Sequence, residues 1–118
     1  MPFQVSYEHN KDYVIARVAG EAPVEAFLAM LQDVGAESVT WQASAVMVDL
    51  RGVETRYSFT EQLRIGEAVA RNLRHLRRAA ALVPAERITR VGEKAANHLG
   101  ATVRVFSSEA EALDWIRN

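Results

Sequence analysis

The sequence predicts an α/β domain in which helices pack on a mainly parallel sheet, in the order ββαβαβαβα. Short apolar stretches that suit strands alternate along the chain with longer stretches whose apolar residues recur at helical spacing. Strands that alternate with helices are typical of a parallel sheet joined by crossover helices. Two strand-like stretches come first with only a short polar loop between them, so the first strand is expected to run antiparallel to the second.

The N-terminal part of the chain predicts a hairpin followed by an amphipathic helix. Residues 3–8 alternate apolar and polar side chains, and a second extended stretch begins after a polar loop and continues to Gly20. The first helix is expected to begin at Pro23, because proline suits a first helical position. Apolar residues then recur at helical spacing until Gly35, which is expected to end the helix.

The middle of the chain predicts a buried strand followed by a capped helix. Residues 45–50, with the sequence Ala-Val-Met-Val-Asp-Leu, suit a central strand. The next helix is expected to begin at Ser58 and to run to about Leu76. Ser58 and Glu61 have the spacing of a capping box, in which each residue's side chain accepts a hydrogen bond from the other's backbone amide. Gly66 lies within the apolar face of this helix, and we expect it to allow close backbone contact with the sheet.

The C-terminal part predicts two more strands and two more helices. Residues 79–83 suit a strand, and Pro84 is expected to open the following helix, which ends at Gly100. Residues 101–106 alternate enough to form a strand at a sheet edge. A second capping box begins at Ser108 and predicts a closing helix that packs on the domain.

Outer strands with alternating side chains favour self-pairing, so we also expect a homodimer.

Composition limits the classes of protein to which the chain can belong. Residues 1–118 are 49% hydrophobic and 25% charged, which is typical of one soluble globular domain. A formal net charge of −1 argues against nucleic acid as a partner. No stretch approaches the ~20 apolar residues of a membrane span and the first residues lack a signal-peptide pattern, so we expect no stable membrane insertion and a cytoplasmic location. The absence of cysteine excludes disulfides and thiolate chemistry.

The sequence contains no recognisable motif of a catalytic or cofactor site. It lacks the nucleophile elbow, the phosphate-binding loop, the dinucleotide fingerprint and the zinc-protease motif. The three histidines are widely separated, so no metal site is predicted. We therefore expect a non-enzymatic protein without a cofactor. A basic stretch is interpreted as complementing a helix C-terminal dipole rather than as a binding patch, and it consists of Arg71, Arg74, His75, Arg77 and Arg78.

The loop between the central strand and the capped helix is the candidate site. Two guanidinium groups, the free amides of a helix N-terminus and neighbouring hydroxyls would together favour an anion or a partner there. The candidate residues are Arg51, Arg56, Tyr57, Ser58 and Thr60. The alternative is that the arginines pair at the surface with a carboxylate, either Asp49 or Glu54.

Four segments resemble the SpoIIAA-like family of STAS domains, the fold shared with bacterial anti-sigma-factor antagonists and with the cytoplasmic domains of sulfate transporters. They are residues 46–53, 58–66, 80–96 and 103–116, so the resemblance extends over nearly the whole chain. The last segment has the ending typical of the family, with a phenylalanine at the strand end and a closing helix that contains Ala-Leu-Asp-Trp-Ile. The resemblance implies a regulatory module that binds a protein partner.

The same resemblance places Ser58 near the serine that is phosphorylated in anti-sigma-factor antagonists. The local motif departs from that of the family, because Tyr57 stands in place of an aspartate, and Phe59 and Thr60 stand in place of small residues and glycine. We therefore interpret Ser58 as a helix N-cap. Family relatives with a likeness to lipid-transfer domains imply an alternative function, a carrier of a small molecule or lipid. Such a carrier would need an apolar cavity on the order of several hundred Å³.

Overall fold

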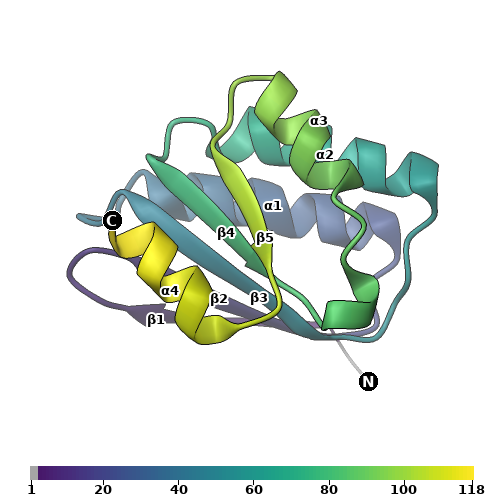
Figure 1. The fold of residues 1–118 in the computed structure, drawn as a ribbon, viewed down its shortest axis with the longest axis horizontal. Helices are drawn as coiled ribbons and strands as arrows, with labels where there is room; N and C mark the ends of the chain where they lie inside the picture. Colours follow the sequence, from purple (N-terminus) through teal and green to yellow (C-terminus); the bar gives the residue numbers. More distant parts are fainter. Residues whose placement is uncertain (1–2) are drawn as a thin grey trace.

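The computed structural model describes residues 3–118, which form one sheet of five strands and four α-helices (Figure 1). The elements follow in the order β1 (Gln4–His9), β2 (Val14–Gly20), α1 (Val24–Ser38), β3 (Ala45–Val53), α2 (Phe59–Leu73), β4 (Arg78–Leu82), α3 (Val91–His98), β5 (Val103–Phe106) and α4 (Glu109–Arg117). A short 3-10 helix, Ala85–Arg87, lies between β4 and α3. The predicted order ββαβαβαβα is therefore confirmed.

The sheet has the predicted mainly parallel arrangement. Its strands lie in the order β1-β2-β3-β4-β5, with β1 antiparallel to β2 and every other neighbouring pair parallel. The strand predicted to be central, β3, lies in the middle of the sheet and extends to Val53 rather than ending at Leu50. The predicted edge strand, β5, lies at an edge. The carboxyl ends of the parallel strands meet at one end of the sheet, which is where ligands usually bind in such folds.

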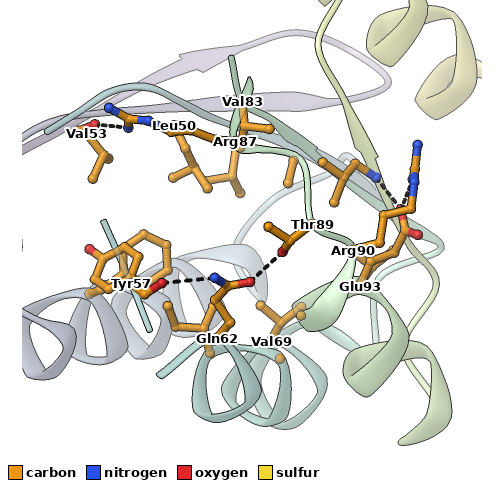
Figure 2. Close-up of a pocket in the computed structure, with 18 of the residues that line it drawn as sticks. Leu50, Val53, Tyr57, Gln62, Val69, Val83, Arg87, Thr89, Arg90 and Glu93 are labelled. Carbon is orange, nitrogen blue, oxygen red and sulfur yellow. Dashed lines mark hydrogen bonds and ion pairs between the residues drawn. The ribbon is translucent and has the colours of Figure 1, made fainter. Parts of the chain in front are cut away.

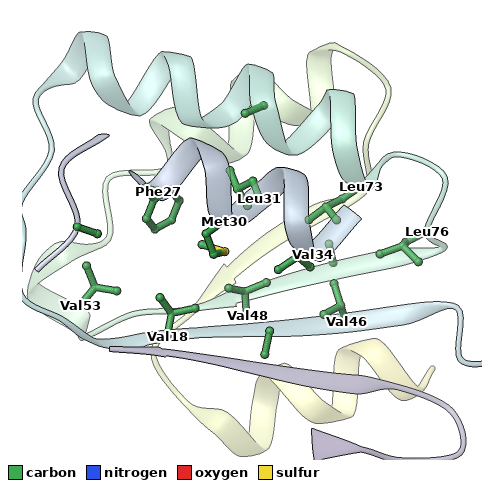
Figure 3. Packing of buried hydrophobic residues seen from close by; sticks show 14 residues of the cluster. Val18, Phe27, Met30, Leu31, Val34, Val46, Val48, Val53, Leu73 and Leu76 are labelled. Atoms are coloured by element: carbon green, nitrogen blue, oxygen red, sulfur yellow. The ribbon is translucent and has the colours of Figure 1, made fainter. Parts of the chain in front are cut away.

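The helices cover the two faces of the sheet unequally, as Figures 1 and 3 show. Of the four helices that the structure describes, α1, α2 and α3 lie on one face, and α4 packs on the other against β3, β4 and β5. Side chains alternate along a strand. Val46 and Val48 of β3 therefore join the core beneath α1, whereas Met47 faces α4 and packs with Ile116. β3 is thus buried on both faces, as its apolar sequence predicted.

Two glycines allow helices to approach each other. Gly35 does not end α1, which continues to Ser38, and that part of the prediction is wrong. A Cβ at Gly35 would lie 2.8 Å from the carbonyl oxygen of Asn72 in α2, so the missing side chain permits this contact. Gly66 also makes a close contact, but its neighbours are Gly92 and Ala95 of α3 rather than the sheet, so the predicted partner was wrong.

Pro84 does not open an α-helix, which corrects a second prediction. It precedes the 3-10 helix Ala85–Arg87, and α3 begins only at Val91. Arg90, immediately before α3, has a left-handed backbone with φ of 62°. Residues 84–90 therefore form an irregular crossing segment that lies past the carboxyl end of β4 (Figure 1).

Two arginines of the basic stretch interact with a different helix from the one expected, whereas Arg71 lies in the last turn of α2 as predicted. Arg77 donates a hydrogen bond to the carbonyl of Ile116 and Arg78 to the carbonyl of Trp115, both at the end of α4. The guanidinium of Arg78 also lies 4.9 Å from the centre of the Trp115 ring. These cations therefore complement the C-terminal dipole of α4, where unpaired carbonyl groups carry partial negative charge.

Candidate functional site

Ser58 caps α2 as predicted. Its hydroxyl accepts a hydrogen bond from the Glu61 amide at 3.2 Å, and its own amide donates to Oε1 of Glu61 at 2.9 Å. Both halves of the capping box are therefore present, and this prediction is confirmed. The other predicted box is half formed: Ser108 accepts from the Glu111 amide at 3.3 Å, but within residues 3–118 the Ser108 amide donates no hydrogen bond to the Glu111 side chain.

Ser58→Ala is expected to lower the free energy of unfolding by about 0.5 to 2 kcal/mol, because an amide of the first helical turn loses its acceptor. Ser58→Asn should preserve most of the stability, since asparagine is also a good N-cap. Urea denaturation measures both variants, and the exposed Ser107 provides the control Ser107→Ala, which should leave stability unchanged.

Protein purified from its native host should carry no phosphate on Ser58. Stoichiometric phosphoserine in a peptide mass spectrum would contradict the assignment of Ser58 to capping alone.

Tyr57 anchors the β3–α2 loop to the start of α1. Its hydroxyl donates to the carbonyl of Ala22 at 2.7 Å. Its ring packs edge-to-face with the Phe27 ring, and the two ring centres are 5.3 Å apart. Thr55 completes the anchor, because its hydroxyl accepts from the Ala22 amide at 2.8 Å. Burial, and next the nearby charge of Glu61, raise the pKa of Tyr57 to about 12. Tyr57 is therefore a neutral structural residue at ordinary pH.

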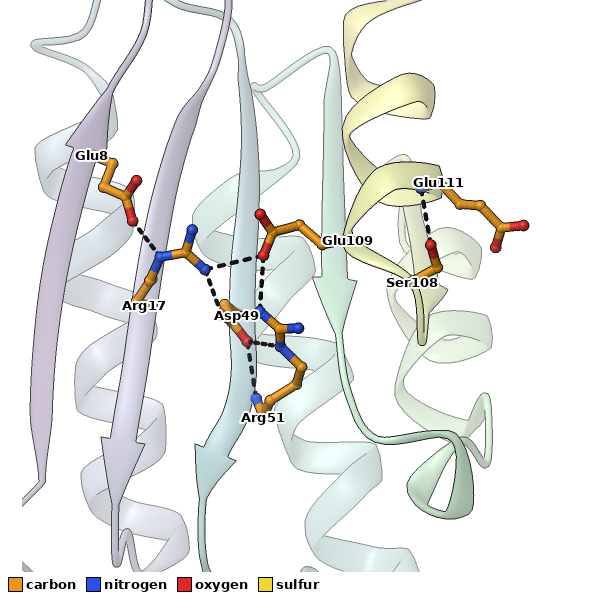
Figure 4. Close-up of polar contacts among 7 residues, drawn as sticks. All are labelled: Glu8, Arg17, Asp49, Arg51, Ser108, Glu109 and Glu111. Atoms are coloured by element: carbon orange, nitrogen blue, oxygen red, sulfur yellow. Dashed lines mark hydrogen bonds and ion pairs between the residues drawn. The ribbon is translucent and has the colours of Figure 1, made fainter.

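Arg51 belongs to an ion-pair cluster on the other side of the sheet (Figure 4). Its guanidinium donates to both carboxylate oxygens of Asp49 at 3.0 Å and to Glu109 of α4 at 2.8 Å. Arg17 donates to the same Asp49 at 2.7 Å. Burial alone would raise the pKa of Asp49, but hydrogen bonds from Arg51 and Arg17 outweigh burial and hold this pKa below its usual value.

The candidate residues therefore divide between two places. Arg51 pairs with Asp49, the alternative that the sequence left open, and faces α4, whereas α2 packs on the opposite face. The expectation that Arg51 and Arg56 add their charges in one loop is wrong for Arg51. The first turn of α2 and the loop before it contain the others, of which Tyr57 is partly buried and the rest are exposed: Arg56, Tyr57, Ser58 and Thr60.

A pocket of about 370 Å³ lies beside this loop, between the sheet and helices α2 and α3 (Figure 2). Its walls come from β3, β4, β5, α2 and the crossing segment 84–90. Ala79 and Ala81 of β4 also line it, and their small side chains leave room above the strand, whereas the Ala80 side chain packs on the α4 face. Most of the remaining wall is aliphatic, including Leu50, Val53, Ile65, Val69, Val83 and Val105. The volume lies at the small end of the range for ligand pockets.

Polar side chains bridge the two walls of the pocket. The Gln62 amide donates to the carbonyl of Tyr57 at 2.9 Å and accepts from the Thr89 hydroxyl, so it links the β3–α2 loop to the crossing segment (Figure 2). Arg87 donates to the carbonyl of Val53 at the end of β3 at 2.5 Å. Sequence reasoning missed these residues, because residues 84–90 have no periodicity and their contacts come from elements far away along the chain.

Two features are absent from residues 3–118, a metal-binding cluster and a membrane-spanning helix. Within residues 3–118 no three histidine, aspartate or glutamate side chains are grouped so that they could hold a metal ion. No helix in the same range is both long and apolar enough to cross a membrane.

Comparison with known proteins identifies the family. The model of the SpoIIAA-like family matches residues 13–117. An anti-sigma factor antagonist from Mycobacterium paratuberculosis has 20% identity and a TM-score of 0.68, covering 99% of this chain and 96% of that chain. The anti-sigma factor antagonist SpoIIAA in its unphosphorylated form has 18% identity and a TM-score of 0.62, covering 98% and 96%. An uncharacterized protein with a SpoIIAA-like fold from Shewanella loihica has 15% identity and a TM-score of 0.57, covering 97% and 93%.

No curated protein sequence matches the chain significantly. The solved structures share its five-stranded sheet fold over nearly their whole length, and the family match extends from β2 to the end of α4. The chain belongs to the SpoIIAA-like family.

Proposed function

We propose that the domain is a non-enzymatic regulatory module that binds a protein partner through the β3–α2 loop and the first turn of α2. Two structures with the same fold are of anti-sigma factor antagonists, which act on proteins, and they support this class of function. A cytoplasmic location and the homodimer expected from the outer strands belong to the same proposal.

The exposure of Phe59 is the observation that carries the proposal. This residue is the first of α2 and is 64% exposed, although it is large and apolar. Burial of an aromatic side chain contributes strongly to protein interfaces. The exposed residues next to it are polar or charged, namely Arg56, Ser58 and Thr60, so an aromatic anchor lies within a polar rim.

Phe59→Ser is expected to abolish capture of the partner from extracts of the native host. Val39→Ser is the matched control, because Val39 is 74% exposed but lies at the end of α1. Quantitative mass spectrometry should find a protein retained by wild type and by Val39→Ser but lost with Phe59→Ser. Titration of that purified protein should reproduce the difference. If Phe59→Ser and wild type bind the purified protein equally, the partner surface lies elsewhere.

The second candidate function is that of a carrier for a small apolar molecule, which the pocket of about 370 Å³ favours. The two functions share structural parts, because Arg56, Tyr57 and Gln62 line the pocket and belong to the loop and helix of the proposed partner surface.

A further inference from the structure

One residue lining the pocket, Arg87, carries a positive charge that no neighbouring carboxylate in the described part of the chain neutralises. Arg87 lines the pocket and is partly buried, and its Nη1 group donates to the carbonyl of Val53. Its Nε atom is buried and has no hydrogen-bond partner within residues 3–118. Buried donors are nearly always paired, so the Arg87 guanidinium lacks an acceptor for Nε within the described residues.

The other charges around the pocket do not supply that acceptor. Arg90 pairs with Glu93 at 2.8 Å, and the same Glu93 oxygen accepts from the amide of Val105. Glu86 also lines the pocket but is exposed and forms no ion pair among the described residues. Neither Arg56 nor Arg87 has a carboxylate within ion-pair distance in the part of the chain that the structure describes. The walls of the pocket are therefore mainly apolar, and the unpaired guanidinium groups of Arg56 and Arg87 make part of its lining positively charged.

We propose that the pocket binds an amphipathic carboxylate, whose carboxylate group pairs with Arg87 and whose apolar body lies against the valines and leucines of the walls. A guanidinium presents several N–H donors in a planar fork, and a carboxylate matches two of them at once. Nε is covered by protein atoms, whereas Nη2 is not buried and forms no hydrogen bond within residues 3–118, so Nη2 is the donor left for the carboxylate. The apolar walls favour an aliphatic body, and the volume of about 370 Å³ limits it to one short or medium chain.

This inference rests on the carrier function and assigns its ligand class. Isothermal titration with octanoate and 1-octanol separates the two claims, because these probes share one chain length and differ in charge. Octanoate is expected to bind about tenfold more tightly than 1-octanol, as a charge-assisted hydrogen bond predicts. Arg87→Gln should remove that preference without weakening 1-octanol. Arg104→Gln is the matched control, since Arg104 is exposed on β5 and lies outside the pocket.

Two further variants keep the test decisive. Arg87→Lys retains the charge and should retain part of the preference, even if the contact with Val53 is lost. Val69→Phe places a ring in the pocket and should abolish binding of both probes. If octanoate and 1-octanol bind equally well to wild type, or if Arg87→Gln keeps the preference, the carboxylate assignment is overturned and the carrier function stands. Failure of both probes to bind wild type overturns the carrier function itself.

Discussion

Gly66→Ala is expected to lower the free energy of unfolding by about 2 to 3 kcal/mol, although alanine is the better helix former. An added Cβ would lie 2.7 Å from the carbonyl oxygen of Gly92 and 2.8 Å from Cβ of Ala95. Neither atom is at the end of a flexible side chain, so α2 and α3 would have to move apart. Because both helices border the pocket, the variant should also change probe binding there.

Gly92→Ala is the matched control for this prediction. Its added Cβ would lie 3.4 Å from the nearest atom, the carbonyl oxygen of Gln62, which is an ordinary contact. Alanine in α3 should therefore be neutral or slightly stabilising. Urea denaturation of both variants measures the difference, and equal stabilities of Gly66→Ala and Gly92→Ala would contradict the close contact of α2 and α3.

Asp49→Asn is expected to lower the free energy of unfolding by about 1.5 to 3 kcal/mol at neutral pH. Asp49 is 7% exposed and accepts four hydrogen bonds, three from Arg51 and one from Arg17. Asparagine keeps the shape but has no charge to balance two guanidinium groups. The arginines reach solvent, which limits the loss. Asp33→Asn, at an exposed position of α1, should change stability little and serves as the control.

The pH dependence gives this prediction a second readout. The folded pKa of Asp49 lies below its ordinary value, so its contribution is fully present above about pH 4, the unfolded carboxyl value, and is lost as the pH falls through the folded pKa. The stability difference between wild type and Asp49→Asn should therefore be constant at neutral pH and shrink in acid. A difference that persists unchanged at pH 2 would show that the charge of Asp49 is not its source.

The regular elements could be predicted from the sequence because their signals are local. The capping box of Ser58 depends on residues three apart, and the apolar sequence of β3 reports burial on both faces directly. Helix ends at glycine were less predictable. Gly35 is typical of a helix stop when read locally, yet its purpose is contact with Asn72, which lies in another helix. The same reason explains why the neighbour of Gly66 was misidentified.

The candidate site was only partly predictable, because its charges are arranged by the fold. Arg51 and Arg56 are close in sequence, but Arg51 lies on the α4 face of the sheet and pairs there with Glu109, which lies in the last helix. Arg87 is held beside the pocket by its hydrogen bond to the carbonyl of Val53 at the end of β3, and these two residues are 34 apart in the sequence. No local pattern could have revealed either contact. The small side chains of β4 were visible in the sequence, but their consequence, space for a pocket, depends on how α2 and α3 sit above them.

Photo-crosslinking tests the proposed partner surface most directly. A p-benzoylphenylalanine residue is introduced in place of Phe59 in one variant and in place of Val39 in another, and both are irradiated in the native host. A covalent adduct with one protein is expected at position 59 and none at position 39, because the exposed aromatic of α2 lies within the proposed surface and the end of α1 lies outside it. Adducts at position 39 with none at position 59 would contradict the proposed surface.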